Sequence, residues 1–197
     1  MSVLHQLNDE VAALAEKVKL SLVQVRCGRD GGAAGTVWHP DGLILTNAHV
    51  VGGARPRVRL PDGSTLEARV LVRHTSLDLA ALAVDAEELC PIPLGDSGAL
   101  EPGQFVLALG HPWGIKNAVT AGIVMGAGAD YLDVKYPQRL VAVNLSLRPG
   151  NSGGPLVDSA GRLVGINTMM TGPDSGLAIP VNVAKAFLKE EIGARNS

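Results

Sequence analysis

Short apolar segments separated by turn residues run through most of this chain. Turns are expected at Pro40-Asp41-Gly42, at Pro61-Asp62-Gly63 and at 158–161, because Gly, Pro, Asp and Ser dominate tight turns. Runs of Val, Leu, Ile and Ala bounded by such turns are typical of β-strands. The expected strands are 20–28, 33–38, 43–45, 65–73, 79–84, 105–109, 119–125, 140–143, 155–157, 163–168 and 176–179. No long helical pattern separates them, which favours an all-β fold.

Helical patterns occur only near the two ends. The apolar positions Leu4, Leu7, Val11, Leu14 and Val18 follow one another at steps of three and four, the spacing of an amphipathic helix. Ser2 is available as its N-cap. A second short helix is expected over 183–192, capped by Asn182.

Three arginines alternate with other residues in the segment 55–59. Arg55, Arg57 and Arg59 would share one face of a strand, since side chains alternate between the two faces. A solvated strand face is the preferred interpretation, with a basic binding face as the alternative.

Composition restricts the class of protein. The 197 residues are 46% hydrophobic and only 3% aromatic, so Val, Leu, Ile and Ala must fill the core. A net charge of −2 gives no general attraction to nucleic acid or anionic membranes, and no apolar run approaches the roughly 20 residues that cross a bilayer. We expect no nucleic-acid partner, no membrane span, no metal and no cofactor. No signal peptide is visible, so the location reads as cytoplasmic, or as extracytoplasmic if the sequence is trimmed.

The glycine-rich loop from Gly150 to Pro155 encloses Ser152. A serine hydroxyl becomes a useful nucleophile only with a neighbouring base and with donors aimed at the charge on the attacked carbonyl. Glycines allow strained turns in which the N–H groups of Gly150 and Ser152 converge. Taken alone, the loop is better interpreted as a plain turn between strands, because Gly, Asn, Ser and Pro dominate turns.

Chain order limits the kinds of hydrolase. The histidines His5, His39, His49, His74 and His111 all precede the serine. The loop also fits the GxSxG elbow of α/β-hydrolases, but their histidine follows the serine, so that interpretation fails. The orders of chymotrypsin-like and subtilisin-like enzymes remain, and the absence of long helices between strands argues against the second.

A base and an acid are found in two apolar segments. His49 follows the strand 43–45 beside a small alanine, a suitable place for a cleft residue. Asp78 is a single carboxylate inside an apolar run, and a buried charge needs a partner. The ring N–H of His49 would serve; a turn cap near Thr75 is the alternative for Asp78, and His74 is a rival base.

Six blocks of sequence resemble motifs of the HtrA (Deg, high-temperature-requirement) serine proteases. They occur in the family's order, with similar spacing, over roughly residues 20–190. The blocks are Thr46-Asn47-Ala48-His49-Val50-Val51, Leu77-Asp78-Leu79-Ala80, Leu94-Gly95-Asp96-Ser97, Leu109-Gly110-His111-Pro112-Trp113-Gly114, Gly150–Pro155 and Leu177-Ala178-Ile179-Pro180. The resemblance implies a trypsin-like fold of two six-stranded antiparallel β-barrels, with His49, Asp78 and Ser152 as the catalytic triad.

The same resemblance implies a division of the chain. The expected parts are an N-terminal helix (1–19), a first barrel with His and Asp (20–90), a connector (91–103), a second barrel with Ser (104–181) and a C-terminal helix (182–197). No PDZ domain is expected within these residues.

Function follows as an expectation of the resemblance. A serine endopeptidase would cleave unfolded or misfolded polypeptides through an acyl-enzyme, in protein quality control. The expected oxyanion-hole donors are the N–H groups of Gly150, Asn151 and Ser152, and a peptide flip at 148–150 would switch the enzyme off. The expected specificity pocket is apolar and lined by Leu147, Leu177, Ala178 and Ile179. His111 is expected to be structural.

The sequence departs from the family in places. Val143-Asn144-Leu145 stands where Thr-Asp-Ala is typical, and the loop 169–175 is short. The resemblance implies a homo-oligomer, a trimer, yet no aromatic residue precedes Trp38. The alternative function is a non-catalytic, peptide-binding or chaperone-like module on the same fold. A purely structural adaptor would leave Asp78 unexplained.

Overall fold

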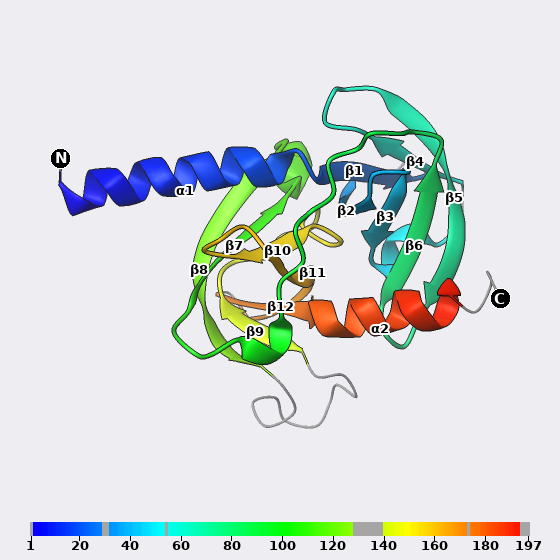
Figure 1. The fold of residues 1–197 in the computed structure, drawn as a ribbon. Coiled ribbons are helices and arrows are strands. Elements are labelled where there is room, and N and C mark those ends of the chain that lie inside the picture. The colour runs from blue at the N-terminus through cyan, green and yellow to red at the C-terminus, as the bar shows by residue number, and fades with distance from the viewer. Residues whose placement is uncertain (1, 29–31, 54, 128–139, 173, 194–197) are drawn as a thin grey trace.

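The computed structural model describes residues 2–28, 32–53, 55–127, 140–172 and 174–193. Its first half forms a closed antiparallel barrel (Figure 1) with the strand order β1-β2-β3-β6-β5-β4. The strands are β1 (Leu22–Cys27), β2 (Ala33–His39), β3 (Leu43–Thr46), β4 (Pro56–Arg59), β5 (Thr65–His74) and β6 (Leu79–Val84). Closure pairs every strand on both sides, so the barrel has no open edge.

The second half forms another closed antiparallel barrel, in the order β10-β11-β12-β9-β8-β7. Its strands are β7 (Phe105–Gly110), β8 (Ala118–Ala127), β9 (Val141–Asn144), β10 (Pro155–Asp158), β11 (Leu163–Gly172) and β12 (Ser175–Pro180). The prediction of two six-stranded barrels is therefore confirmed. Three short 3₁₀ helices complete the barrels: η1 (Ala48–Val51), η2 (Ser97–Ala99) and η3 (Pro112–Gly114).

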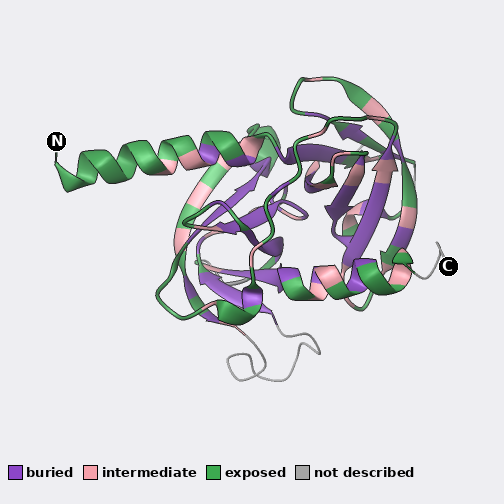
Figure 2. Cartoon of the chain, in the orientation of Figure 1, coloured by how far each residue is buried: buried purple, intermediate pink, exposed green. Residues whose placement is uncertain are grey.

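The two α-helices lie at the two ends of the chain. Helix α1 (Val3–Lys19) begins as expected, because the hydroxyl of Ser2 accepts a hydrogen bond from the N–H of His5 at 3.3 Å. It projects away from the barrels and is buried only near its C-terminal end, at Ala15 and Val18 (Figure 2). No helix in the described part of the chain is long and apolar enough to span a membrane.

Helix α2 (Val181–Glu191) corrects one expectation. Its N-cap position is occupied by Pro180 rather than Asn182, because helical geometry starts two residues earlier than predicted. The amide of Asn182 instead donates to the carboxylate of Asp96 at 2.7 Å. Proline suits this position because its fixed φ already leads into a helix.

A continuous hydrophobic cluster joins the two barrels. It contains Leu45 and Leu79 from the first barrel, Leu109 and Ile166 from the second, and Phe187 of α2. Phe187 is 1% exposed, and burying such a side chain contributes roughly 1.5–3 kcal/mol. Helix α2 crosses beside both barrels (Figure 1), so one core fixes their relative position.

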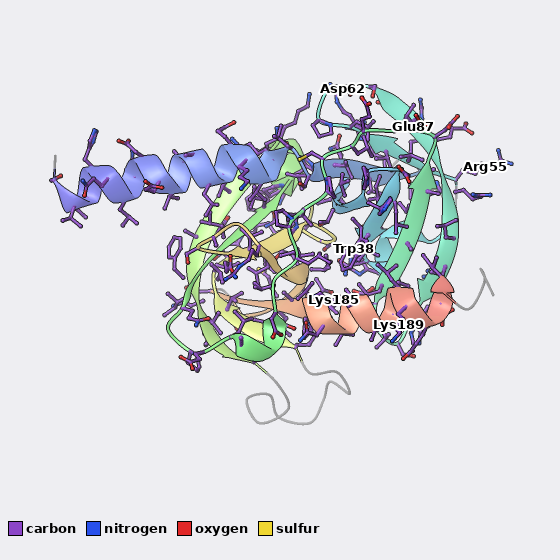
Figure 3. The ribbon with its side chains drawn as sticks, in the orientation of Figure 1. Trp38, Arg55, Asp62, Glu87, Lys185 and Lys189 are labelled. Atoms are coloured by element: carbon purple, nitrogen blue, oxygen red, sulfur yellow. The ribbon has the colours of Figure 1, made fainter. Side chains whose placement is uncertain are left out.

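The connector between the barrels is tied to each of them by backbone hydrogen bonds. The N–H of Ile92 donates to the carbonyl of Val37 at 3.0 Å, and the N–H of Leu163 donates to the carbonyl of Pro93 at 2.7 Å. Helix α2 adds a further link, since Lys185 (labelled in Figure 3) donates to the carbonyl of Gly95 at 2.6 Å. The groove between the barrels therefore has firmly positioned walls.

Candidate active site

His49 and Asp78 come from neighbouring strands of the first barrel. His49 lies in η1, directly after β3, and Asp78 immediately precedes β6. Because β3 and β6 are paired, with Thr46 opposite Ala80, the two side chains meet. The Nδ1 atom of His49 lies 2.9 Å from both carboxylate oxygens of Asp78, and the His49 N–H donates to Oδ1 at 3.0 Å.

Asp78 has a strained backbone that a buried amide supports. Its φ of 51° is in the left-handed region, which costs a non-glycine residue of order 1–3 kcal/mol. The side-chain amide of the fully buried Asn47 donates to the Asp78 carbonyl at 3.0 Å. Asn47 thus holds the turn that aims the carboxylate at His49, a role that sequence reasoning did not assign.

Thr168 of the second barrel provides another contact to Asp78. Its hydroxyl donates to Oδ2 at 2.7 Å. Burial by itself would raise the pKa of Asp78, but hydrogen bonds from the His49 ring, the Thr168 hydroxyl and the His49 N–H together hold that pKa below its ordinary value. Asp78 is therefore a stable carboxylate. No sequence signal distinguished Thr168 from other strand residues.

The loop that carries Ser152 is docked onto the first barrel. The N–H of Ala34 in β2 donates to the Ser152 carbonyl at 2.8 Å, and the Thr36 hydroxyl donates to the Gly153 carbonyl at 3.1 Å. A Cβ on Gly153 would lie 2.2 Å from the Ala34 carbonyl oxygen, so only glycine permits this approach. The serine is thereby placed at the junction of the barrels.

Ser152 and His49 line the same pocket, which has a volume of 330 Å³. The Ser152 hydroxyl donates to the Thr168 carbonyl at 3.0 Å. Within the described part of the chain no hydrogen bond joins Ser152 to His49. The structure thus brings the three predicted triad residues to one place, with the serine rotamer directed at Thr168.

The backbone before Ser152 leaves two donors available. The carbonyl of Pro149 accepts from the Trp113 N–H at 3.2 Å, and in a trans peptide the following N–H, that of Gly150, points the opposite way. In the described chain neither the Gly150 N–H nor the Ser152 N–H has a hydrogen-bond partner. The N–H of Asn151 differs, because it donates to the Arg148 carbonyl at 2.9 Å. In this conformation Asn151 is turned into the loop.

His111 supports the loop that carries Ser152. Its N–H donates to the Gly150 carbonyl at 2.9 Å, and its Nδ1 accepts from the Asn117 N–H at 3.2 Å. Burial, assisted by the nearby charge of Lys116, lowers the pKa of His111. The residue is a neutral, buried support, as the structural interpretation predicted.

The rival roles considered for nearby residues find no support. The Nδ1 atom of His74 accepts from the Leu77 N–H at 3.2 Å, and its ring packs edge-on against Phe187, away from Ser152. The Asp78 N–H does close a turn onto Thr75 at 3.2 Å, but its carboxylate faces His49.

The pocket beside Ser152 differs from the expected specificity pocket. It is lined by Leu147, as predicted, and by Arg148, Pro149, Thr168, Met169 and Met170. Leu177, Ala178 and Ile179 are 0% exposed and do not line it. Leu177 and Ile179 pack in the cluster that joins the barrels, and Ala178 packs inside the second barrel. The reason is strand order: β11 lies between β12 and the cleft. No carboxylate lines this pocket, and no group of three or more His, Cys, Asp or Glu among the described residues is placed to hold a metal ion.

The chain is similar to serine proteases that are already known. The trypsin-like peptidase domain family matches residues 33–166. Serine protease HTRA2, mitochondrial, from Bos taurus is 41% identical over 160 residues, covering 79% of this chain and 35% of that protein. Protease Do-like 1, chloroplastic, from Arabidopsis thaliana is 39% identical over 171 residues, covering 81% and 39%. The chain therefore spans well under half the length of these relatives.

Solved structures agree with the sequence relatives. HtrA-type protease AlgW with a tripeptide superposes with a TM-score of 0.84 at 30% identity, over 92% of this chain and 64% of that one. AlgW with a decapeptide gives the same TM-score at 26% identity, over 92% and 67%.

Proposed function

We propose that this chain, which belongs to the trypsin-like peptidase family and resembles its HtrA-type members, hydrolyses peptide bonds through an acyl-enzyme at Ser152. The observation that carries the proposal is the joint placement of three groups. His49 is paired with a stable Asp78 carboxylate, shares a pocket with Ser152, and faces a loop with two unused N–H donors.

In the proposed reaction the Oγ atom of Ser152 attacks the substrate carbonyl carbon. His49 Nε2 takes the hydroxyl proton as the Oγ–C bond forms, and returns it to the leaving amine as the C–N bond breaks. A water molecule then attacks the ester carbonyl while His49 Nε2 takes its proton; the C–Oγ bond breaks as His49 returns that proton to Ser152, and the carboxylic acid product leaves. Asp78 holds Nδ1–H, so the tautomer with a basic Nε2 is favoured.

The reaction requires the Ser152 side chain to turn from Thr168 toward His49. This is a change between staggered rotamers that gives up one neutral hydrogen bond, worth about 0.5–1.5 kcal/mol. Such a step is small beside a catalytic barrier, and catalytic hydrogen bonds are often long or misaligned before substrate binds.

The N–H groups of Gly150 and Ser152 are the proposed oxyanion donors. One donor of this kind contributes about 3–4 kcal/mol to transition-state stabilisation. The expected third donor, the N–H of Asn151, is not included, because it already donates to the Arg148 carbonyl.

The pocket supports cleavage after apolar residues of moderate size. Leu147, Met169 and Met170 provide an apolar, adaptable lining, and a basic substrate side chain would find Arg148 instead of a carboxylate. The stretch Thr168–Met170 of β11 pairs with β12, but within the described residues β10 pairs with β11 only as far as Ile166. An extended polypeptide can add to that edge, so unfolded proteins are the proposed substrates.

Incubation with unfolded casein tests this function. Wild-type protein should release peptides, and Ser152→Ala should release none above background while keeping the same unfolding midpoint. A serine-directed phosphonate should add covalently to wild type and not to Ser152→Ala, as measured by intact mass. Intact casein and an unlabelled serine would contradict the proposal.

One observation favours a second candidate, a non-catalytic peptide-binding module. The Ser152 hydroxyl donates to the Thr168 carbonyl and not to His49. A cleft that binds peptides without cleaving them does not need a hydrogen bond between serine and histidine, so this arrangement is compatible with such a module. Casein binding of equal strength in wild type and Ser152→Ala, without products, would establish that alternative.

A further inference from the structure

A second hollow begins on the other side of the serine loop. It has a volume of 460 Å³ and is lined by Gln24 and Arg26 of β1, by Trp113 and Gly114 of η3, and by Pro149. Pro149 also lines the Ser152 pocket. A chain that enters along the edge of β11 and passes Ser152 therefore continues into this hollow.

The hollow leads onto a basic surface. A neighbouring recess of 200 Å³ is lined by the same Gln24 and Arg26, together with Arg57 and Arg59 of β4 and Thr65. We call the two recesses together the arginine groove. Figure 3 labels Arg55 and Asp62, which precede and follow β4 in the chain. Arg57 and Arg59 are the exposed residues of β4, so the groove lies on the outer face of this strand.

The positive charges of the groove are close together. Arg26 lies directly opposite Arg57 in the β1–β4 ladder, where Cβ atoms are about 5 Å apart and like charges destabilise a sheet. Arg59 lies two residues further along the same exposed face. Within the described chain none of these three guanidinium groups forms an ion pair. Glu67, opposite Arg57, is 3.9 Å from Arg55 instead.

The strand ladder gives the distance from the serine. The Ser152 carbonyl accepts from Ala34, Ala34 is opposite Gln24, and Gln24 is opposite Arg59. Three steps of about 4.8 Å separate Ser152 from Arg59, and an extended chain that rises about 3.3 Å per residue covers them with four or five residues.

We propose that the arginine groove selects substrates with acidic residues three to five positions after the cleaved bond. The inference rests on the proposed function for its direction, since the Ser152 pocket is assigned to the residue before the cleaved bond. Guanidinium groups suit carboxylates because they donate two parallel hydrogen bonds. An acidic segment would also relieve the repulsion between Arg26 and Arg57. The groove shares Pro149 with the Ser152 pocket, which favours an acidic peptide over nucleic acid as the occupant.

Two quenched fluorescent peptides test the groove. Both carry the same residues up to an apolar cleavage position; one has three Asp or Glu at positions three to five after it, and the other has Asn or Gln. For the wild type kcat/KM should be about 10-fold higher for the acidic peptide at low salt, and the ratio should shrink toward one at high salt. Equal hydrolysis of the two peptides at low salt would overturn the proposal.

Substitutions of the groove arginines test which residues produce the preference for the acidic peptide. Arg57→Gln/Arg59→Gln should reduce the ratio to below about 3-fold through slower hydrolysis of the acidic peptide, and Arg57→Lys/Arg59→Lys should retain most of the wild-type ratio. The matched control is Arg69→Gln, an exposed arginine of β5 outside the groove, which should keep the wild-type ratio. A preference that survives Arg26→Gln/Arg57→Gln/Arg59→Gln would place acid recognition elsewhere.

Binding separates this proposal from the proposed function. In a Ser152→Ala background, anisotropy of the labelled peptides should show tighter binding of the acidic one, lost with the arginine-to-glutamine changes. Tighter binding of the acidic peptide without cleavage by the wild type would overturn the proposed hydrolysis but support acid recognition by the arginine groove. Cleavage of both peptides at equal rates would overturn only acid recognition by the groove. Displacement of the acidic peptide by a short single-stranded oligonucleotide that binds more tightly would assign the groove to nucleic acid and overturn the proposal.

Discussion

Thr168 contacts Ser152 and Asp78 at once: its carbonyl accepts from the Ser152 hydroxyl at 3.0 Å, and its own hydroxyl donates to Asp78 at 2.7 Å. One residue of the second barrel thus connects Ser152, the proposed nucleophile, to the Asp78 carboxylate of the first barrel. Because the proposed triad is divided between the barrels, this contact helps to align its two halves.

Replacing Thr168 by Val should reduce kcat roughly 10-fold with little change in KM, because one of the hydrogen bonds that orients Asp78 is lost. Val keeps the shape and the backbone carbonyl. Thr168→Ser is the matched control, since it retains the hydroxyl, and it should keep most of the activity. Steady-state kinetics on one apolar peptide is sufficient, and unchanged kcat in Thr168→Val would show that the hydroxyl is dispensable.

Asn47→Ala should destabilise the fold by about 1–3 kcal/mol, because the Asp78 carbonyl would lose its buried donor. Activity should fall as well, since Asp78 needs that support to keep its left-handed backbone. Urea unfolding measures the first effect. The exposed Asn8→Ala serves as control and should leave the midpoint where it is; equal midpoints for the two variants would contradict the role of Asn47.

Gly153→Ala compared with Gly103→Ala separates steric from conformational cost. Both glycines have positive φ, 84° and 92°, so each alanine carries a backbone penalty of about 1–2 kcal/mol. Only at Gly153 would the new Cβ meet other atoms, 2.2 Å from Ala34 O and Thr46 Oγ1, whereas nothing lies within 4 Å at Gly103. Thermal unfolding should show a clearly larger loss for Gly153→Ala, together with loss of casein cleavage. Similar losses would mean that the loop can leave β2 without cost.

The lowered pKa of His111 predicts a pH-dependent stability. Between its folded-state pKa and the ordinary 6.5, the unfolded chain binds a proton at this histidine that the folded chain does not. The free energy of unfolding should therefore fall as pH drops below 6.5, by at most about 1.4 kcal/mol per pH unit, and level off below the folded pKa.

His111→Asn should flatten that dependence, because the asparagine oxygen can accept from Asn117 without titrating. Asn8→Ala, which removes an exposed side chain that does not titrate, is the control and should leave the slope unchanged. Urea unfolding at pH 7, 6 and 5 measures these slopes. A slope that persists in His111→Asn would assign the effect to other groups.

Much of the fold could be predicted from the chain because its signals are local. Apolar runs bounded by Pro-Asp-Gly turns located most strands within a few residues, and Ser2 marked the start of α1. The prediction that Asn182 caps α2 was wrong, because the fixed φ of Pro180 already starts the helix. The position of this start depends on tertiary contacts, since Asn182 and Lys185 of α2 bind the connector at Asp96 and Gly95.

The sequence by itself determined which side chains are proposed for catalysis: a serine among glycines, a lone carboxylate in an apolar run, and a histidine that precedes them in the chain. It could not reveal Thr168, Asn47 or the buried positions of Leu177, Ala178 and Ile179, since these depend on which strand lies next to the cleft. Tertiary structure also decided the Ser152 rotamer and the alignment of Arg26 with Arg57 and Arg59. The physical reason is that residue type and turn chemistry act over a few neighbours, whereas barrel closure and strand register are set by packing of the whole chain.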